Sequence, residues 1–144
     1  MKTNSKHLGL VTKKFNEFFF VDLKHKENFG NSERFLCKVR KSIKFKDQFI
    51  YVGDEVEIDN IDLKSKRAVI TSLKKRKNLL IRPSVANISN IYIIFSVEEP
   101  ELNLSQLNRF LILAESMGAE VSLVLTKCDL ISDTKRSSLL DKFK

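Results

Sequence analysis

The chain has 144 residues, of which 42% are hydrophobic and 31% are charged, and its formal net charge is +8. This length fits one ordinary domain or two small ones, and the hydrophobic content is sufficient for a packed core. Gly and Pro are scarce, with four and two residues, which excludes a low-complexity chain. The N-terminal charges are not followed by an apolar signal segment, and the longest apolar runs of about eight residues are too short to span a bilayer. We therefore expect a cytoplasmic protein that does not enter a membrane.

The cysteines and histidines give no sign of a metal site. Cys37 and Cys128 are far apart, and neither they nor His7 and His25 show the spacing of metal ligands. A disulfide framework is not expected either, which is typical of a reducing, intracellular environment. We predict no metal ligands in this chain.

The charge divides the chain into two parts. Residues 1–82 contain 20 Lys and Arg against 10 Asp and Glu, a net charge of +10. Residues 83–144 contain 6 against 8, a net charge of −2. This difference predicts two units with different partners, residues 1–82 and residues 83–144, with the border near Arg82–Ser84.

The first part is typical of a small all-β domain. In "RFLCKVR" (34–40), Phe35, Cys37 and Val39 alternate with basic residues, as the two faces of a strand require. Turn-forming stretches such as "VGDE" (52–55) separate the candidate strands. Six candidates within about 70 residues fit a five-stranded barrel of the OB type. The predicted strands are 7–11, 18–23, 34–40, 48–52, 54–58 and 67–73.

The second part predicts a strand, a helix and a parallel strand. "ISNIYIIFSV" (88–97) is nearly continuously apolar, which is typical of a strand buried on both faces. From Asn103 the apolar residues recur every three or four positions, so a helix is expected to start after Asn103 and to end before Gly118. "AEVSLVLT" (119–126) is a second buried strand, and Ser132 caps a further helix. Because this βαβ unit cannot cover both faces of its strands, we expect some apolar surface to remain open.

The stretch "TKCD" (126–129) follows the second of these strands. In open α/β sheets, ligands bind beyond the carboxyl ends of the strands. There Asp129 can accept two hydrogen bonds from the N–H and NH₂ groups of guanine, and the stem of Lys127 can lie along the base with its ammonium group on loop oxygens. Alternatively, Thr126 simply ends a strand and Asp129 caps a turn, because four letters also occur by chance.

The segment "SLKKRKNLLIRP" (72–83) is a candidate RNA-binding surface. Its clustered cations could neutralise several phosphates, or could form an ordinary solvated face. The aromatic residues Phe18, Phe19, Phe20 and Tyr51 could stack on bases or could belong to the core. The candidate RNA-binding residues are Arg40, Lys41, Lys44, Lys46, Lys74, Lys75, Arg76 and Lys77.

Four segments together resemble one family. They are "CKVRKSI" (37–43), "GDEVEI" (53–58), "KKRKNLLIRPSVANISNIYIIFSVEEP" (74–100) and "LNRFLILAESMGAEVSLVLTKCDL" (107–130). These segments are similar to the ribosome small-subunit-dependent GTPase A family, circularly permuted GTPases that help the small ribosomal subunit to mature. The resemblance covers nearly the whole chain in order.

The resemblance implies an OB-fold barrel followed by the incomplete βαβ start of a circularly permuted P-loop GTPase domain. The permutation places the guanine-recognition residues Thr126, Lys127 and Asp129 ahead of the phosphate loop. The family usually has Asn at the position of Thr126, whereas Lys127 and Asp129 match its motif. The family also has a small zinc-binding domain, so zinc is expected only in a C-terminal domain beyond these residues.

A phosphate loop is not present in these 144 residues. None of the four glycines has the spacing G-x-x-x-x-G-K-[ST]. We therefore expect the sites for the phosphates and Mg²⁺ to lie outside this chain, no catalytic residue within it, and no GTP hydrolysis by this chain alone.

The resemblance implies a GTPase of small ribosomal subunit biogenesis. The intact protein is expected to hydrolyse GTP to GDP with Mg²⁺, to bind the rRNA of the small ribosomal subunit, and to be a monomer. The alternative is a free-standing OB-type RNA-binding module without nucleotide binding.

Overall fold

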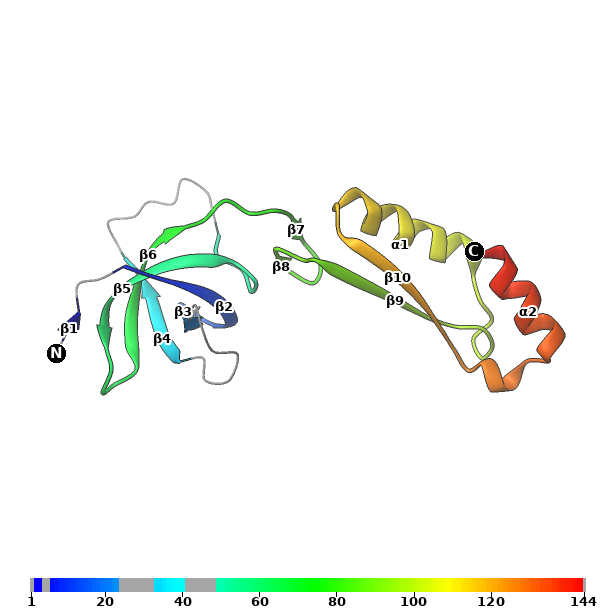
Figure 1. The fold of residues 1–144 in the computed structure, drawn as a ribbon, viewed down its shortest axis with the longest axis horizontal. Coiled ribbons are helices and arrows are strands. Elements are labelled where there is room, and N and C mark those ends of the chain that lie inside the picture. Colours follow the sequence, from blue (N-terminus) through cyan, green and yellow to red (C-terminus); the bar gives the residue numbers. More distant parts are fainter. Residues whose placement is uncertain (1, 4–5, 24–32, 41–48, 144) are drawn as a thin grey trace. The chain divides into compact units, whose positions relative to one another are not determined.

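The computed structural model describes residues 2–3, 6–23, 33–40 and 49–143. The chain forms two compact units, Met1–Ile88 and Ser89–Lys144 (Figure 1). Each unit has its own hydrophobic core. The domain border predicted after Arg82 lies within the first of these units.

The first unit is a closed five-stranded β-barrel. The strands follow the order β5–β2–β3–β4–β6, and pairing of β6 with β5 closes the ring. Strands β4 and β6 are parallel, whereas the other neighbours in the ring are antiparallel. The prediction of an OB-type barrel is therefore confirmed. The bounds are β1 (Lys2–Thr3), β2 (His7–Phe15), β3 (Phe18–Leu23), β4 (Arg34–Val39), β5 (Glu55–Asp62) and β6 (Arg67–Leu73).

Alternation along the strands builds the core of the barrel. In β3, Phe19, Val21 and Leu23 are buried, whereas Phe18 and Phe20 are half-buried on the opposite face. The same alternation predicts the bounds of β3 and β6 correctly, because one face of each strand must leave water. The fully buried hydrophobic residues of this core are Val11, Val21, Phe35, Cys37, Val56, Ile58 and Ile70.

The strand predicted at 48–52 is wrong for its described residues, 49–52. Val52 forms only an isolated bridge, to Val85. The Asp54 carboxylate accepts a hydrogen bond of 2.8 Å from the Tyr51 amide, and the Asp54 amide donates to the Tyr51 carbonyl at 3.2 Å. These local bonds form a turn that competes with strand pairing, although the residues themselves favour a strand.

A hairpin of β7 (Leu79–Leu80) and β8 (Val85–Ala86) is attached to the barrel at Gly53. The Asn87 side-chain amide donates to the Gly53 carbonyl at 2.8 Å. Gly53 has a φ of +88°, and a Cβ at this position would lie 2.1 Å from the Ala86 carbonyl oxygen. Glycine is therefore required where the hairpin meets the barrel.

The second unit is the predicted βαβ unit. Strands β9 (Asn90–Ser96) and β10 (Glu120–Thr126) are parallel, in a register that runs from Asn90 opposite Glu120 to Ser96 opposite Thr126. Helix α1 (Leu104–Ser116) connects them. A short 3₁₀ turn, η1 (Cys128–Leu130), and helix α2 (Asp133–Lys142) follow.

The helix ends are those predicted from the sequence. The Asn103 side chain accepts a hydrogen bond of 3.0 Å from the Gln106 amide, and Ser132 accepts one of 3.3 Å from the Lys135 amide. Gly118 has a φ of +62° just beyond α1. These caps satisfy backbone groups that have no partner inside the helix.

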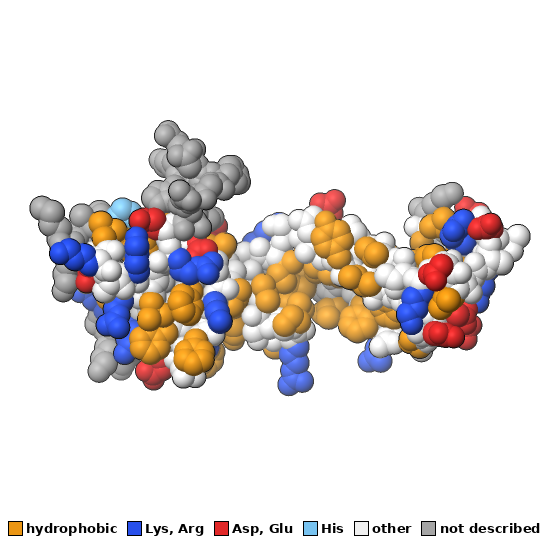
Figure 2. All heavy atoms as spheres, turned by 90° about the horizontal axis from the view of Figure 1, so that it is seen from below, with side chains coloured by type: hydrophobic (Ala, Val, Ile, Leu, Met, Phe, Trp, Pro, Cys, Tyr) orange, Lys and Arg blue, Asp and Glu red, His pale blue; other side chains and the backbone are white. Residues whose placement is uncertain are grey.

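Only one face of the β9–β10 pair is covered. Ile93 packs with Leu107 and Ala114 of α1, whereas Tyr92 is 66% exposed and Ile94 is 64% exposed. The expectation that β9 is buried on both faces is therefore wrong for these residues, because nothing in the described chain covers the second face. Figure 2 shows hydrophobic side chains at the surface of this unit. None of the helices in the described ranges is long and apolar enough to cross a membrane.

We expect Gly53→Ala to destabilise the first unit much more than Gly118→Ala destabilises the second. Each substitution forces a left-handed conformation that costs roughly 1–2 kcal/mol. Only Gly53 adds a collision with a backbone oxygen, because nothing lies within 4 Å of a Cβ at Gly118. We therefore expect a total loss of about 3 kcal/mol or more at Gly53.

Urea unfolding, together with hydrogen exchange of the amides in β7 and β8, measures this difference. Equal losses for the two alanine variants would contradict the proposed contact between Gly53 and the hairpin.

Candidate functional site

The loop after β10 makes a sharp turn at Lys127. This residue has φ 57° and ψ 32°, in the left-handed region that few non-glycine residues adopt. Cys128–Leu130 then form one 3₁₀ turn, in which the Leu130 amide donates to the Lys127 carbonyl at 3.1 Å. The turn leaves both Lys127 and Asp129 exposed beyond the carboxyl end of the strand.

Thr126 connects the ends of the two parallel strands. Its hydroxyl donates to the Phe95 carbonyl of β9 at 3.2 Å, and its own carbonyl accepts a hydrogen bond of 3.1 Å from the Val97 amide. The hydroxyl of Thr126 is therefore engaged with the backbone of the sheet.

Lys127 reaches the loop that follows β9. Its ammonium group donates to the backbone carbonyl of Glu99, a residue that has a φ of +49°. The Ser96 hydroxyl donates to the Pro100 carbonyl at 3.0 Å within the same loop. The side chain of Lys127 thus connects the loop after β10 to the loop after β9. Its apolar stem extends between the loops, and its ammonium group is bound by a backbone oxygen.

Asp129 presents an exposed carboxylate two residues after this lysine. Within the described part of the chain it has no hydrogen-bond or ion-pair partner, and it is exposed. A carboxylate is an acceptor with two oxygens, so Asp129 can accept a pair of neighbouring N–H donors.

The start of α2 is held against the same loop. Lys135 forms an ion pair of 2.8 Å with Glu98, and hydrogen bonding to Glu98 raises the pKa of Lys135. Both side chains are substantially exposed, so this pair orients the two segments and adds little stability. The loop after β9 therefore contacts Lys127 through Glu99 and α2 through Glu98.

An apolar pocket of about 450 Å³ lies in the second unit between β10 and α2. The thiol of Cys128 borders it and donates to the Leu125 carbonyl at 3.6 Å. The residues that line the pocket are Val97, Leu123, Leu125, Cys128, Ile131, Arg136, Leu139, Leu140 and Phe143.

The predicted basic residues are in the first unit. Because β4 and β6 run parallel, Arg40 and Lys74 leave the barrel at the same end, and the Arg40 amide donates to the Ile70 carbonyl at 3.1 Å. Arg40, Lys74, Lys75 and Lys77 are exposed. Lys41, Lys44 and Lys46 lie outside the described residues.

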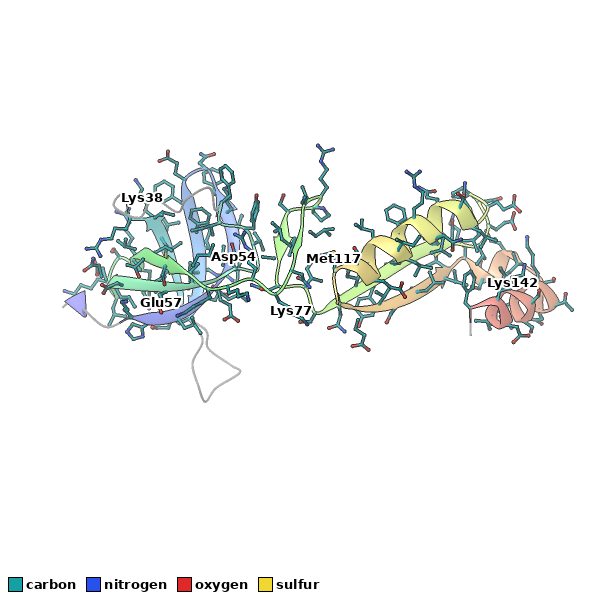
Figure 3. The ribbon with its side chains drawn as sticks, turned by 90° about the horizontal axis from the view of Figure 1, so that it is seen from above. Lys38, Asp54, Glu57, Lys77, Met117 and Lys142 are labelled. Carbon is teal, nitrogen blue, oxygen red and sulfur yellow. The ribbon has the colours of Figure 1, made fainter. Side chains whose placement is uncertain are left out.

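Arg76 has a structural partner. Its guanidinium group holds the buried carboxylate of Asp54 with two hydrogen bonds, of 2.6 and 2.7 Å, and also donates to the Phe49 carbonyl. It lies 5.0 Å from the centroid of the Tyr51 ring, and the hydrogen bond to Asp54 raises its pKa. Figure 3 shows Asp54 at the end of the barrel that faces the hairpin. The guanidinium group of Arg76 is thus engaged by Asp54 and the Phe49 carbonyl, and Lys74 is paired with Glu57, whereas Lys75 and Lys77 have no ion-pair partner among the described residues.

Two of these contacts could not be predicted from the sequence. The partner of Lys127 is a backbone carbonyl, a group that every residue has. The partner of Arg76 is a carboxylate 22 residues earlier in the chain. By contrast, the position of Asp54 in "GDEVEI" does carry a signal. It directly follows a glycine, and aspartates in turns often bind backbone groups of the turn.

The described residues contain no candidate metal site, and the thiol of Cys37 is buried. No group of three or more His, Cys, Asp and Glu side chains there could hold a metal ion. Cys37 is fully buried, and burial raises its pKa to about 12, so its thiol stays protonated and inert.

Comparison with known proteins supports a single assignment. The family description "RsgA GTPase" matches residues 73–144. The chain is 35% identical to the small ribosomal subunit biogenesis GTPase RsgA of Prochlorococcus marinus strain NATL1A, over 98% of this chain and 47% of that protein. It is also 35% identical to RsgA of Clostridium beijerinckii, over 91% of this chain and 42% of that protein.

Two solved structures have the same fold. YjeQ from Thermotoga maritima matches with a TM-score of 0.80 and 29% identity, over 95% of this chain and 47% of that one. YloQ, described as a circularly permuted GTPase, matches with a TM-score of 0.80 and 25% identity, over 96% of this chain and 47% of that one.

Fold and sequence thus place the chain among the circularly permuted GTPases of ribosome biogenesis. The chain belongs to the RsgA GTPase family. It spans about half the length of the relatives that it matches.

We expect the first unit to lose stability in acid through Glu57. Hydrogen bonds from Lys74 and then Ser72 lower the pKa of Glu57 from 4.5 to about 2. Because the folded pKa lies below the unfolded one, this contribution is complete above about pH 4.5 and is lost as the pH falls towards 2. Glu57→Gln should therefore flatten the dependence of stability on pH between these values, measured by urea unfolding at several pH values.

Lys74→Met provides the matched comparison, because it removes the main cause of the shift and keeps the carboxylate. It should also flatten the curve, since Glu57 then regains a more ordinary pKa. Parallel curves for the wild type and Glu57→Gln would show that the pair is not formed in solution.

Proposed function

We propose that this chain supplies the RNA-binding barrel and the guanine-recognition loop of a small ribosomal subunit biogenesis GTPase. In this proposal residues 1–82 bind rRNA of the small ribosomal subunit, and residues 83–144 begin the GTPase domain. The protein acts as a monomer in the cytoplasm, where its ribosomal partner is assembled.

The guanine site consists of Lys127 and Asp129, with Thr126 in support. The observation that carries the proposal is the ammonium group of Lys127 held on the Glu99 carbonyl, in the same turn as the exposed carboxylate of Asp129. Asp129 accepts the N–H and NH₂ groups of guanine, and the stem of Lys127 lies along the face of the base. Adenine does not present this donor pair and would leave the carboxylate without partners.

Thr126 takes the position at which the family usually has Asn. Its hydroxyl bond to the Phe95 carbonyl supports a role in holding the loop rather than in touching the base. We propose that this chain recognises guanine with two side chains instead of three.

Hydrolysis of GTP to GDP requires a phosphate loop and Mg²⁺, and the 144 residues contain no G-x-x-x-x-G-K-[ST]. We propose that these groups lie elsewhere in the complete protein and that the chain alone does not hydrolyse GTP. Release of phosphate from GTP by this chain in the presence of Mg²⁺ would contradict that statement.

We expect Asp129→Asn to change the base preference from guanine to xanthine. Xanthine presents a carbonyl where guanine has its amino group, and the amide of Asn can donate to that carbonyl. The ratio of GTP to XTP affinity should fall about 10- to 100-fold, the effect of one hydrogen bond to a charged group. Competition against a fluorescent guanine nucleotide measures it, in a protein that joins this chain to a phosphate loop.

Asp133→Asn is the matched control, because Asp133 is 88% exposed at the start of α2 and lies outside the proposed site. If the chain is instead an OB-type RNA-binding module without nucleotide binding, neither variant will alter nucleotide affinity.

We expect the double variant Lys75→Ala and Lys77→Ala to weaken binding to small-subunit rRNA. The slope of log affinity against log salt should fall by about 0.7–0.9 for each phosphate contact that is lost. Fluorescence anisotropy at several salt concentrations measures affinity and slope together. Arg109→Ala with Lys142→Ala is the control, since it removes the same charge from the second unit.

Arg76→Ala should behave differently, because it leaves the buried carboxylate of Asp54 without its partner. We expect a loss of about 3 kcal/mol or more in stability. If the Lys75 and Lys77 variant binds with unchanged affinity and slope, the basic segment does not contact RNA.

A further inference from the structure

The outer face of strands β2, β3 and β4 combines aromatic and basic side chains. The pairing register places Phe15 opposite Phe18 and Phe18 opposite Lys38 in one row across the three strands. In the neighbouring row, Lys13 is opposite Phe20 and Phe20 is opposite Leu36. We call this surface the aromatic–lysine face; its members are Lys13, Phe15, Phe18, Phe20, Leu36 and Lys38.

These aromatic rings are accessible. Phe15 is 62% exposed, and Phe18 and Phe20 are half-buried, whereas Phe19 on the other face of β3 is only 6% exposed. Phe19 therefore packs in the core of the barrel, whereas Phe15, Phe18 and Phe20 lie on its outer face. A soluble barrel gains no stability from an exposed phenylalanine, so this face is suited to contact with a partner.

The charge on the face is positive. The ammonium group of Lys38 lies 4.5 Å from the centroid of the Phe18 ring, and Lys13 is exposed in the next row. Arg40 is exposed two residues beyond Lys38, and Glu17, in the turn between β2 and β3, is the nearest acidic residue along the chain to Phe15 and Phe18. In the row after Phe20 and Leu36, Arg34 forms an ion pair of 2.7 Å with Asp22. These two charges offset each other, so this row adds no net charge to the face.

We propose that the aromatic–lysine face binds single-stranded RNA by stacking bases on Phe15, Phe18 and Phe20, while Lys13 and Lys38 contact phosphates. This inference rests on the proposed RNA-binding function and adds the mode of binding and the residues. Rows of one sheet face repeat every two residues, or roughly 7 Å, so successive bases can reach successive rings. Proteins that bind single strands without sequence preference use aromatic rings to stack on the bases and cations to contact the phosphates.

The surface fits a single strand better than other anionic partners. A duplex hides the faces of its bases, so the aromatic rings would remain unused. An acidic peptide would satisfy the lysines but gives the rings nothing to stack on. Figure 3 shows Lys38 and Glu57 on different sides of the barrel, so this face is distinct from the one where Lys74 pairs with Glu57.

The experiment measures binding of the full chain to a fluorescein-labelled oligouridine of about ten nucleotides, the length one OB fold accommodates. We expect Phe15→Ala to lower the affinity at least about fivefold, with the salt slope unchanged. Lys13→Ala with Lys38→Ala should lower the slope by about 0.7 for each contact. Phe49→Ala is the matched control, because Phe49 is 69% exposed and lies outside the two rows.

Phe15→Leu keeps an apolar side chain but removes the aromatic ring. Because the proposed contact is stacking on that ring, Phe15→Leu should lower the affinity almost as much as Phe15→Ala. Circular dichroism confirms that the exposed-site variants remain folded. Equal affinities for Phe15→Ala and Phe49→Ala would overturn the inference while leaving RNA binding through Lys75 and Lys77 intact.

Equally strong competition by duplex RNA or by polyglutamate would also overturn it, in favour of a partner that only needs positive charge. If the wild-type chain binds no RNA, both this inference and the RNA part of the proposed function fail.

Discussion

The parallel pairing of β9 with β10 is the constraint on which the candidate site depends. Its register places Ser96 opposite Thr126, so the loops that follow the two strands leave the same edge of the sheet. Lys127 can therefore donate to the Glu99 carbonyl, although the two residues lie 28 positions apart. In an antiparallel arrangement these loops would lie at opposite ends. The guanine-recognition hypothesis thus requires the crossover helix α1, because only a long connection can return the chain to a parallel strand.

A second set of contacts, at Gly53 and Asp54, links two of the segments that resemble the family, 53–58 and 74–100. "GDEVEI" (53–58) provides Gly53 and the buried carboxylate of Asp54. The segment 74–100 provides Arg76, which binds that carboxylate, and Asn87, whose side-chain amide donates to the Gly53 carbonyl. The buried pair is costly to form, and losing one partner would leave an unpaired charge inside the protein. The segments 53–58 and 74–100 are therefore linked by one set of contacts, which fixes the hairpin to the barrel.

The sequence predicted most of the fold because alternation and helix caps are local signals. Strands β3 and β6 and the caps at Asn103 and Ser132 were all predicted where they occur. The strand predicted at 48–52 does not form in its described residues, 49–52, because a hydrogen bond between Tyr51 and Asp54 overrides their strand preference. For the site, "TKCD" indicated the loop but not the partner of Lys127. The role of Arg76 depends on a tertiary contact, and nothing in four consecutive cations distinguishes one that will be buried.

Net charge is therefore an incomplete guide to an RNA surface, and the ion pairs show which cations remain for phosphates. In the first unit, Asp22 pairs with Arg34, Glu33 with Lys66, Asp54 with Arg76, and Glu57 with Lys74 and Lys6. The four carboxylates offset most of the field of these five cations at short range, although Lys6 shares Glu57 with Lys74 and lies 3.7 Å from that carboxylate. Lys13, Lys38, Lys75 and Lys77 have no such partner among the described residues. Part of the positive charge in the described residues of the barrel thus lies on the aromatic–lysine face and on the exposed lysines after β6, and in our proposals these are the two surfaces that contact RNA.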